Sequence, residues 1–485
     1  MLCLLAPLGA EAQHRIYPSP ELTPEVQRIR KARSPFRAST DVALPASVDN
    51  STTAYFPPII DQQGGSCAQA AGIGYMFTYE LNRLLQRDAR ASDDHRMSYL
   101  FVWNMINGGQ DQGSMVESGL QIAKQYGVMS EEDFGSTFVY NYKWATGYEH
   151  YLHAMRNRAS EILSFEDSIP LIKRYLYDGG DGSRPGGVVT FSTMAEGWRF
   201  MRDYDGPSAT GYHCLLTHLG TDGSHALTIA GYDDLVTYVD DQGVRHTGAF
   251  IVVNSWGTYS HDNGRFYLPY DFFRDPDVKS MELSNSMNGV RVTTYEPKLI
   301  FRIGLSYTSR DDLRFGMNEG QNREQQLPST SFYFSHIFYH QGGDLNMQGQ
   351  WRPADIDLAI DYTSHLNDRK APELYYLNVV KQPHGKATGE GEVQRVEVID
   401  LRGQQPVVHS YHGALPQSIQ NGSNIFAIAL RPLYSFVASA LQWLTGGEPT
   451  SETLLLRTAS GRHAKFQVAN QEGGSIRLHY SILNE

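Results

Sequence analysis

The residues that could do chemistry in this chain begin with a cysteine at the start of a helical pattern. Cys67 follows a glycine-bearing turn, residues 62–66, and precedes apolar residues that recur at three- and four-residue steps through about Leu85. A thiol at a helix N-terminus lies near unpaired N–H groups and the positive end of the helix dipole, which favour the thiolate. The glycines let a substrate backbone approach closely. We therefore expect Cys67 to be a nucleophile, with a small buried cysteine as the alternative.

A thiolate nucleophile needs a base and a group that orients the base. His225 opens an apolar strand pattern that ends in a glycine turn, and Asn254 directly follows a second such pattern. An asparagine carbonyl can accept the imidazole N–H and fix its tautomer without adding charge. Trp256, two residues further on, could shield that bond from water. The chain has 17 histidines, so a structural role is the alternative for His225 taken alone.

The order of these motifs resembles the papain-like cysteine peptidases. The motifs are Cys67 after a glycine turn, His225 in an H-A-x-x-x-x-G-Y strand and Asn254 in N-S-W-G. His225 follows Cys67 by 158 residues and Asn254 follows it by 187, somewhat more than in the family, so the loops between them are longer. The resemblance covers roughly residues 45–295. It implies an α+β domain of two lobes, one helical and one β-barrel-like.

The resemblance also implies roles for individual residues. Cys67 would attack a peptide carbonyl, His225 would carry the proton and Asn254 would orient the imidazole. Residues 111–114 resemble the family's glycine turn that lines a substrate pocket, so Gly113 and Ser114 are expected to bind substrate. The residues beside the catalytic groups, Ser224 and Trp256, are expected to contact substrate as well.

Several positions depart from the family's pattern. The family usually places an oxyanion-binding Gln six residues before the nucleophile, where this chain has Asp61. We expect Gln62 to take that role, and Gln63 remains the alternative. Gly64 stands where a cysteine usually precedes the nucleophile, so that disulfide is absent, and Tyr259 or a neighbour replaces the usual second tryptophan. These changes resemble a bacterial branch, similar to secreted proteins of the Bacteroidetes type.

Length and charge limit the classes of partner. The chain has 485 residues, with 41 Lys and Arg against 53 Asp and Glu, a net charge of −12. Because the basic residues are scattered, nucleic acid is not an expected partner. Three cysteines cannot build a disulfide framework. The apolar stretch 425–444 has the length of a membrane span, but Arg431 and Pro432 interrupt it, so no transmembrane segment is expected.

The chain divides into four predicted parts. Residues 1–12 are similar to the end of a secretory signal peptide, which predicts a secreted, periplasmic or cell-surface protein. Residues 13–45 are predicted to be an extended leader or short pro-segment whose basic cluster is either a processing site or a solvated linker. Residues 46–295 are the predicted papain-like peptidase domain. Residues 296–485, with short alternating strands, are a predicted β-sandwich extension whose aromatics either form its core or bind a polymer or cell surface.

No metal or other cofactor is expected. Cys214 lies near His213 and His218, but adjacent ligands are geometrically awkward and no fourth ligand is evident. The paired acidic residues at 93–94, 233–234 and 240–241 lack the spacing of an EF-hand and are predicted to be solvated turns.

These observations predict a secreted cysteine endopeptidase that acts on peptides or proteins through a Cys-His-Asn acyl-enzyme mechanism. Two alternatives stay open. One is a catalytically inactive binding protein on a peptidase scaffold, and the other is an amidase or transpeptidase with the same three residues.

Overall fold

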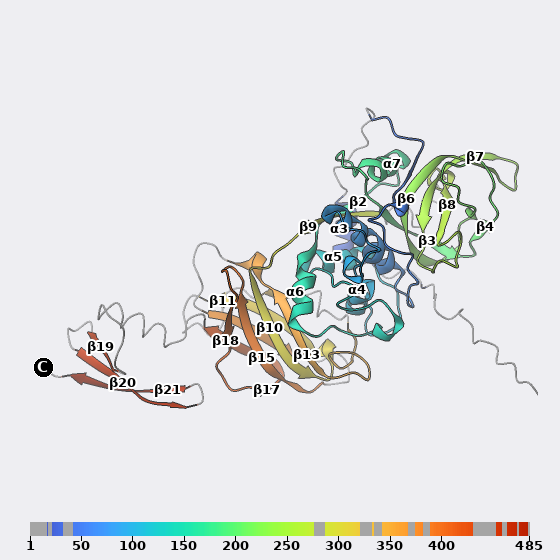
Figure 1. Cartoon of the computed structure of the whole chain (residues 1–485). Helices are drawn as coiled ribbons and strands as arrows, with labels where there is room; N and C mark the ends of the chain where they lie inside the picture. The colour runs from blue at the N-terminus through green and yellow to red at the C-terminus, as the bar shows by residue number, and fades with distance from the viewer. Residues whose placement is uncertain are drawn as a thin grey trace, which may run out of the picture.

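The chain folds into an α+β part of two lobes, followed by β-sheets (Figure 1). The computed structural model describes residues 17, 22–32, 42–275, 287–320, 332–333, 342–366, 374–381, 389–429, 453–457, 463–472 and 475–483. Among the helices in this part of the chain, none has the length and apolar character needed to cross a bilayer. Residues 430–444 of the apolar stretch 425–444 lie outside the described residues.

Helices gather in one lobe around the cysteine helix. This helical run consists of α2 (Cys67–Gln69), a π-helical segment η3 (Ala70–Phe77) and α3 (Thr78–Leu85), which confirms the predicted helix through Leu85. Two further helices of this lobe are α4 (Tyr99–Ile106) and α5 (Val116–Gln125). α6 (Tyr148–Arg156) shares the core of this lobe, whereas α7 (Ile169–Asp178) packs into the core of the second lobe.

The basic segment near the N-terminus contains a helix, α1 (Pro24–Lys31), where an extended leader was expected. The local sequence explains it, because Thr23 caps the helix through its hydroxyl and Pro24 has the backbone angle of a first helical position. Arg30 on this helix pairs with Glu117 of α5 at 2.6 Å, so α1 is docked on the helical lobe. Residues 33–41 lie outside the described residues.

The second lobe is built on one nine-stranded sheet. Its order is β2-β9-β3-β6-β7-β8-β5-β4, with β1 paired to β6. The two predicted strands of this lobe, the one with His225 and the one before Asn254, are confirmed as β6 and β7. The bounds are β1 Ser47–Asp49, β2 Asn157–Ser164, β3 Val189–Glu196, β4 Arg199–Met201, β5 Leu215–His218, β6 Asp222–Val239, β7 Arg245–Val253, β8 Arg265–Pro269 and β9 Asn288–Thr294.

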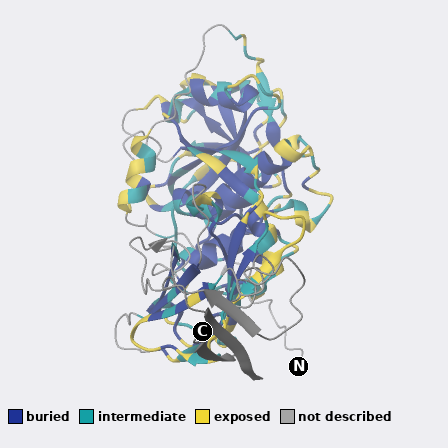
Figure 2. Ribbon diagram, turned by 90° about the vertical axis from the view of Figure 1, so that its left-hand side faces the viewer, coloured by how far each residue is buried: buried dark blue, intermediate teal, exposed yellow. Residues whose placement is uncertain are grey.

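Two further sheets follow, both antiparallel. One has the order β13-β10-β15-β16 with β17 beside β15, and the other has the order β12-β11-β14-β18. Apolar residues of both sheets, among them Phe301, Met317 and Leu377, belong to one buried core, as expected for a sandwich (Figure 2). The bounds are β10 Leu299–Tyr307, β11 Leu313–Gly320, β12 Phe332–Tyr333, β13 Asp355–Asp361, β14 Leu374–Lys381, β15 Gly391–Asp400, β16 Val407–Ser410, β17 Gln417–Ser418 and β18 Gly422–Ala429.

The last strands form a sheet of their own. β19 (Thr453–Arg457), β20 (His463–Glu472) and β21 (Ser475–Leu483) pair only with one another among the described strands. Figure 1 shows this sheet beyond the sandwich. The β-rich region after residue 295 therefore contains a two-sheet sandwich and a separate three-stranded sheet.

The sandwich packs directly against the helical lobe. Its buried residues share one apolar core with the helices. Arg158 of β2 donates to Asp361 of β13 at 2.6 Å, and both side chains are almost fully buried. The Arg310 guanidinium lies 4.5 Å from the ring of Trp144 and donates to the Tyr142 carbonyl at 3.1 Å.

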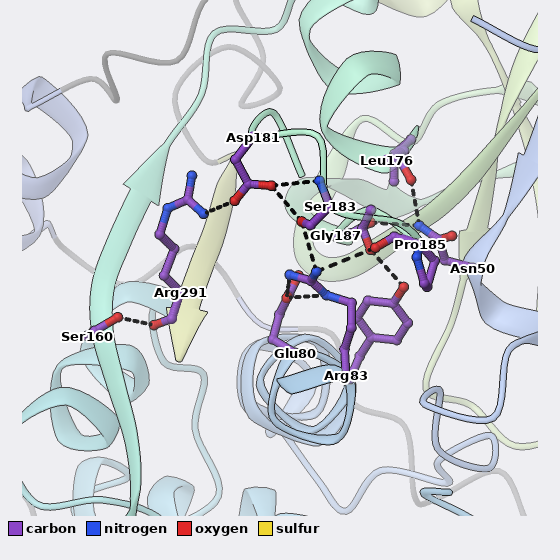
Figure 3. Close-up of polar contacts among 12 residues, drawn as sticks. Asn50, Glu80, Arg83, Ser160, Leu176, Asp181, Ser183, Pro185, Gly187 and Arg291 are labelled. Carbon is purple, nitrogen blue, oxygen red and sulfur yellow. Dashed lines mark hydrogen bonds and ion pairs between the residues drawn. The ribbon is translucent and has the colours of Figure 1, made fainter. Parts of the chain in front are cut away.

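A polar network joins α3 of the helical lobe to the chain that leads into β3 (Figure 3). Arg83 pairs with Glu80 at 2.6 Å and donates to Ser183 at 3.1 Å. Nearby, the buried amide of Asn50 donates to the carbonyls of Leu176 and Gly187, both at 2.8 Å. These bonds hold the two lobes together next to the strands that carry the candidate site.

Candidate active site

The cysteine turn is held in place by a neighbouring loop. Gly64 has φ +54°, in the left-handed region that favours glycine, and the Gly65 N–H donates to Asp111 Oδ1 at 2.8 Å. Cys67 then begins the helical run. Further along that run, Tyr75 accepts from the Ile60 N–H at 2.7 Å and donates to the Asn254 carbonyl at 2.9 Å. One buried hydroxyl thus links the nucleophile's helical run, the segment before its turn and the residue that follows β7.

The Cys67 sulfur lies near the start of β6, the strand that carries His225. The backbone amides of Ala226, the residue after His225, of Ala68 and of Cys67 itself lie near enough to the sulfur to favour the thiolate. Burial raises the pKa of the Cys67 thiol, and these three donors oppose the rise. The N–H groups at the helix start favour the thiolate, as expected, but the effect of burial on the pKa is larger. The thiol therefore needs a proton acceptor beside it to ionise near neutral pH.

His225 and Asn254 lie on neighbouring strands. Thr228 of β6 pairs with Val253 of β7, so His225 stands at the start of one strand close to Asn254 at the end of the other. His225 Nε2 lies 2.8 Å from Asn254 Oδ1, and both residues are buried. This contact has the geometry in which an amide carbonyl orients an imidazole.

Aromatic rings cover the His–Asn bond. The Trp256 ring stacks on His225 with 4.6 Å between centroids and 26° between planes. Trp198, in the turn between β3 and β4, lies 5.8 Å from His225 and 5.6 Å from Trp256. Trp256 is thus beside the bond it was predicted to shield. Trp198 was not singled out, because nothing in its local sequence indicates that the turn folds back over His225.

Gln62 and Gln63 point to different partners. The fully buried Gln62 accepts from the Ser255 hydroxyl at 2.6 Å and donates to the Gly64 carbonyl at 2.9 Å, so its amide lies between the cysteine turn and the residue after Asn254. Gln63 instead donates to the Asp61 carbonyl at 3.0 Å. Of the two glutamines, Gln62 is the one whose side chain bonds to the cysteine turn and to the residue after Asn254.

Two of the residues predicted to bind substrate, Ser114 and Ser224, contact the cysteine helix and the N-terminal segment. The Ser114 hydroxyl accepts from Gln69 of the cysteine helix at 2.9 Å, and Gly113 precedes it in the same half-buried loop. The Ser224 N–H donates to the Tyr17 carbonyl at 2.9 Å, in an antiparallel bridge. A side chain added at Gly65 would meet the Tyr17 ring, so part of the N-terminal segment lies across the site.

The second cysteine lies behind the site. Cys214 is buried, burial raises its pKa to about 11, and its sulfur lies 3.9 Å from His261 Nδ1. The two histidines near Cys214 in the sequence have other partners. His213 Nδ1 contacts the Tyr204 carbonyl, and His218 Nδ1 contacts Thr217.

The acidic pairs have protein partners. Asp233 accepts backbone N–H groups from residues 209, 210 and 235, and Asp234 pairs with Lys173. Asp240 pairs with His246, and Asp93 with Arg96. In the part of the chain that the structure describes, no three His, Cys, Asp or Glu side chains are grouped so as to hold a metal ion.

His261 is a residue of the site that the sequence did not reveal. Its Nε2 lies 2.9 Å from Asn254 Nδ2, and its ring packs against Phe200 with centroids 4.7 Å apart. It stands in the segment where a second tryptophan was expected, whereas the predicted replacement, Tyr259, is largely exposed and bonds to Asp61.

The chain is similar to solved structures of cysteine proteases. Xylellain, a cysteine protease from Xylella fastidiosa, is 18% identical with a TM-score of 0.39, over 59% of this chain and 97% of its own. Procathepsin B S9 from Trypanosoma congolense is 15% identical with a TM-score of 0.37, over 57% of this chain and 83% of its own. The recombinant stem bromelain precursor is 15% identical with a TM-score of 0.36, over 54% and 76%. No family model and no curated protein matches the chain.

Proposed function

We propose that this chain is a papain-like cysteine endopeptidase that hydrolyses peptide bonds through a thioester intermediate. The observation that carries the proposal is the placement of Cys67, His225 and Asn254 around the start of β6. The Cys67 sulfur lies at the Ala226 amide beside His225, and His225 is bonded to Asn254 at 2.8 Å under Trp256. Likenesses at these low identities and TM-scores carry no argument for activity, which rests on this geometry.

The residues support a two-step acyl transfer. His225 takes the proton from Cys67, and the thiolate attacks the peptide carbonyl carbon. The C–N bond breaks as His225 gives that proton to the leaving amine, and a thioester forms on Cys67. His225 then removes a proton from water, which attacks the thioester and releases the acid, and the thiol regains its proton. Gln62 and the Cys67 N–H would bind the oxyanion in both steps.

The N-terminal segment belongs to the proposal as a pro-segment. The Tyr17 carbonyl uses the backbone donor of Ser224, beside His225, and α1 is tied to α5 by the Arg30–Glu117 pair at 2.6 Å. A substrate backbone that needs this edge would compete with Tyr17. Cleavage within the basic cluster should therefore increase turnover, and full activity of a secreted form that starts well before Arg28 would contradict this role.

We also propose that the protein acts outside the cytoplasm, on the basis of the signal-like residues 1–12. The β-rich region after residue 295 would then hold the peptidase on a polymer or cell surface.

The proposal is tested by labelling with iodoacetamide and by turnover of peptide substrates. In the wild type, Cys67 should react rapidly and its alkylation should abolish cleavage. Asn254→Ala should lower the rate of cleavage while labelling stays detectable. Cys214→Ser should remain active, since that thiol lies behind the site. Loss of activity in Cys214→Ser with unchanged activity in Cys67→Ala would overturn the assignment of the nucleophile.

A further inference from the structure

The Asn254 side chain lies between two histidines. Its Oδ1 accepts from the Ser255 N–H at 2.8 Å and lies 2.8 Å from His225 Nε2. Its Nδ2, on the other side, lies 2.9 Å from His261 Nε2. The amide is completely buried, so water offers it no alternative partner. Both ends of this amide are therefore bonded to protein groups.

The positions of the protons follow from these contacts. The Ser255 N–H can only donate, so it requires the amide oxygen on its side and the NH2 group on the side of His261. His225 must then carry a proton on Nε2. The amide NH2 can only donate, so His261 Nε2 must be unprotonated. Neutral His261 carries its proton on Nδ1, which faces the Cys214 sulfur at 3.9 Å.

The surroundings of His261 favour this neutral form. Its ring is packed among Phe200, Phe266 and Trp256, with centroids 4.7, 4.9 and 6.1 Å away. The charged or titratable groups that face it are Arg202, His225 and the Cys214 thiol. Burial, with smaller contributions from Arg202 and His225, lowers the pKa of His261 to about 4. Its backbone has φ +51°, an uncommon conformation outside glycine, so the loop is bent at this residue.

We propose that His261 is a positioning residue that accepts the Asn254 NH2 group and so holds the amide in the only orientation that keeps the His225 proton on Nε2. This leaves His225 Nδ1 unprotonated and able to receive the proton of Cys67. Without this acceptor, only the Ser255 N–H still holds the amide in this orientation. A turned amide, which presents its NH2 group to His225 and favours the opposite tautomer, is then populated more often. The inference rests on the proposed function, since it names a further residue of the same site.

The test uses the full chain with four single variants and the double variant of His261→Phe with Asn254→Ala. His261→Phe keeps an aromatic ring but removes the acceptor, and His261→Gln restores an acceptor oxygen. His218→Phe is the matched control, since His218 is exposed and lies outside the site. Asn254→Ala provides a background in which no amide remains to be oriented. Each protein is assayed for kcat and KM on a cleaved peptide and for the rate of Cys67 alkylation by iodoacetamide between pH 5 and 9.

His261→Phe should lower kcat by roughly 10- to 100-fold with little change in KM, a size typical of outer partners that orient a histidine. Alkylation below pH 7 should fall about as much, because less thiolate is formed by transfer to His225. His261→Gln should recover much of both losses, and His218→Phe should match the wild type. In the Asn254→Ala background, His261→Phe should change either rate by less than about twofold.

Three results would overturn the role of His261. They are unchanged kcat and alkylation in His261→Phe, no recovery in a folded His261→Gln, and an equal loss in both backgrounds, which indicates a merely structural effect. The alkylation assay needs no substrate, so it tests the role of His261 even if no peptide is cleaved. If the wild type cleaves no peptide but its alkylation profile depends on His261, the proposed function fails while the positioning role holds. If peptides are cleaved and neither readout depends on His261, only the positioning role fails.

Discussion

At the scale of single residues, the site consists of buried polar groups whose partners are well defined. Gln62 is bonded to Ser255 at 2.6 Å and to the Gly64 carbonyl at 2.9 Å, which leaves one amide proton of Gln62 for an oxyanion. Gln63, adjacent in sequence, is bonded to Asp61 instead. The two glutamines therefore form a matched pair for mutation, with the same side chain at neighbouring positions and different surroundings.

Gln62→Ala is expected to lower kcat by roughly 100- to 1,000-fold, the usual effect of removing one oxyanion donor. KM should change little, because the donor acts mainly in the transition state. Gln63→Ala should leave kcat close to the wild type. Steady-state kinetics on one peptide substrate checks both. A larger loss in Gln63→Ala than in Gln62→Ala would assign the donor to the other glutamine.

At the scale of elements, the turn before Cys67 and the loop before α5 support each other. The Gly65 N–H donates to Asp111 at 2.8 Å, and a Cβ at Gly64 would lie 2.3 Å from the same carboxylate oxygen. Gly243 offers a matched comparison, since it also has a left-handed φ, +80°, but a Cβ there meets nothing within 4 Å. A substitution at either glycine strains the backbone, but only one at Gly64 also displaces a neighbour of the turn.

Gly64→Ala should lower kcat at least tenfold more than Gly243→Ala, because it displaces Asp111 and so shifts the turn that holds the nucleophile. Both variants should lose roughly 1–2 kcal/mol of unfolding free energy from the left-handed backbone alone. Urea unfolding and kcat are measured for both. Equal activity losses in the two variants would mean that the contact with Asp111 does not position the turn.

Much of the element pattern could be predicted because it is local. Apolar residues at helical spacing predicted the run that begins at Cys67, and β-rich segments predicted β6 and β7, which carry His225 and Asn254. His261 and Trp198 could not be predicted in the same way. They lie in connections between strands, where the local sequence does not show which distant side chain a turn will face. The raised pKa of Cys67 could not be predicted from the sequence either, because the burial of its thiol depends on how the two lobes pack.

At the scale of the whole molecule, the sandwich is part of the structure that supports the helical lobe. Arg158 and Asp361 form an almost fully buried pair across this boundary at 2.6 Å, and Tyr295 donates to the same carboxylate at 2.7 Å. Arg156 and Glu296 form an exposed pair nearby at 3.3 Å. Buried and exposed pairs differ in their cost of disruption, because a charge left alone in the interior keeps its desolvation penalty.

Asp361→Ala should lower the free energy of unfolding by roughly 3–5 kcal/mol, because Arg158 is left buried without its carboxylate. Glu296→Ala should cost less than about 1 kcal/mol. Urea titrations followed by tryptophan fluorescence compare the two variants. Similar small losses in both would show that the buried Arg158–Asp361 pair contributes no more to stability than an exposed pair.

The central claim, that Cys67 is the nucleophile of a peptidase, is tested most directly by digestion of a diverse peptide library. The wild type and Cys67→Ala are incubated under mild reductant after removal of the N-terminal segment, and products are identified by mass spectrometry. We predict cleavage by the wild type alone, with the residues around the cut reporting the preferences of the site. No cleavage by a folded wild type would contradict the claim and favour a binding protein, whereas cleavage by both proteins would place the chemistry elsewhere in the chain.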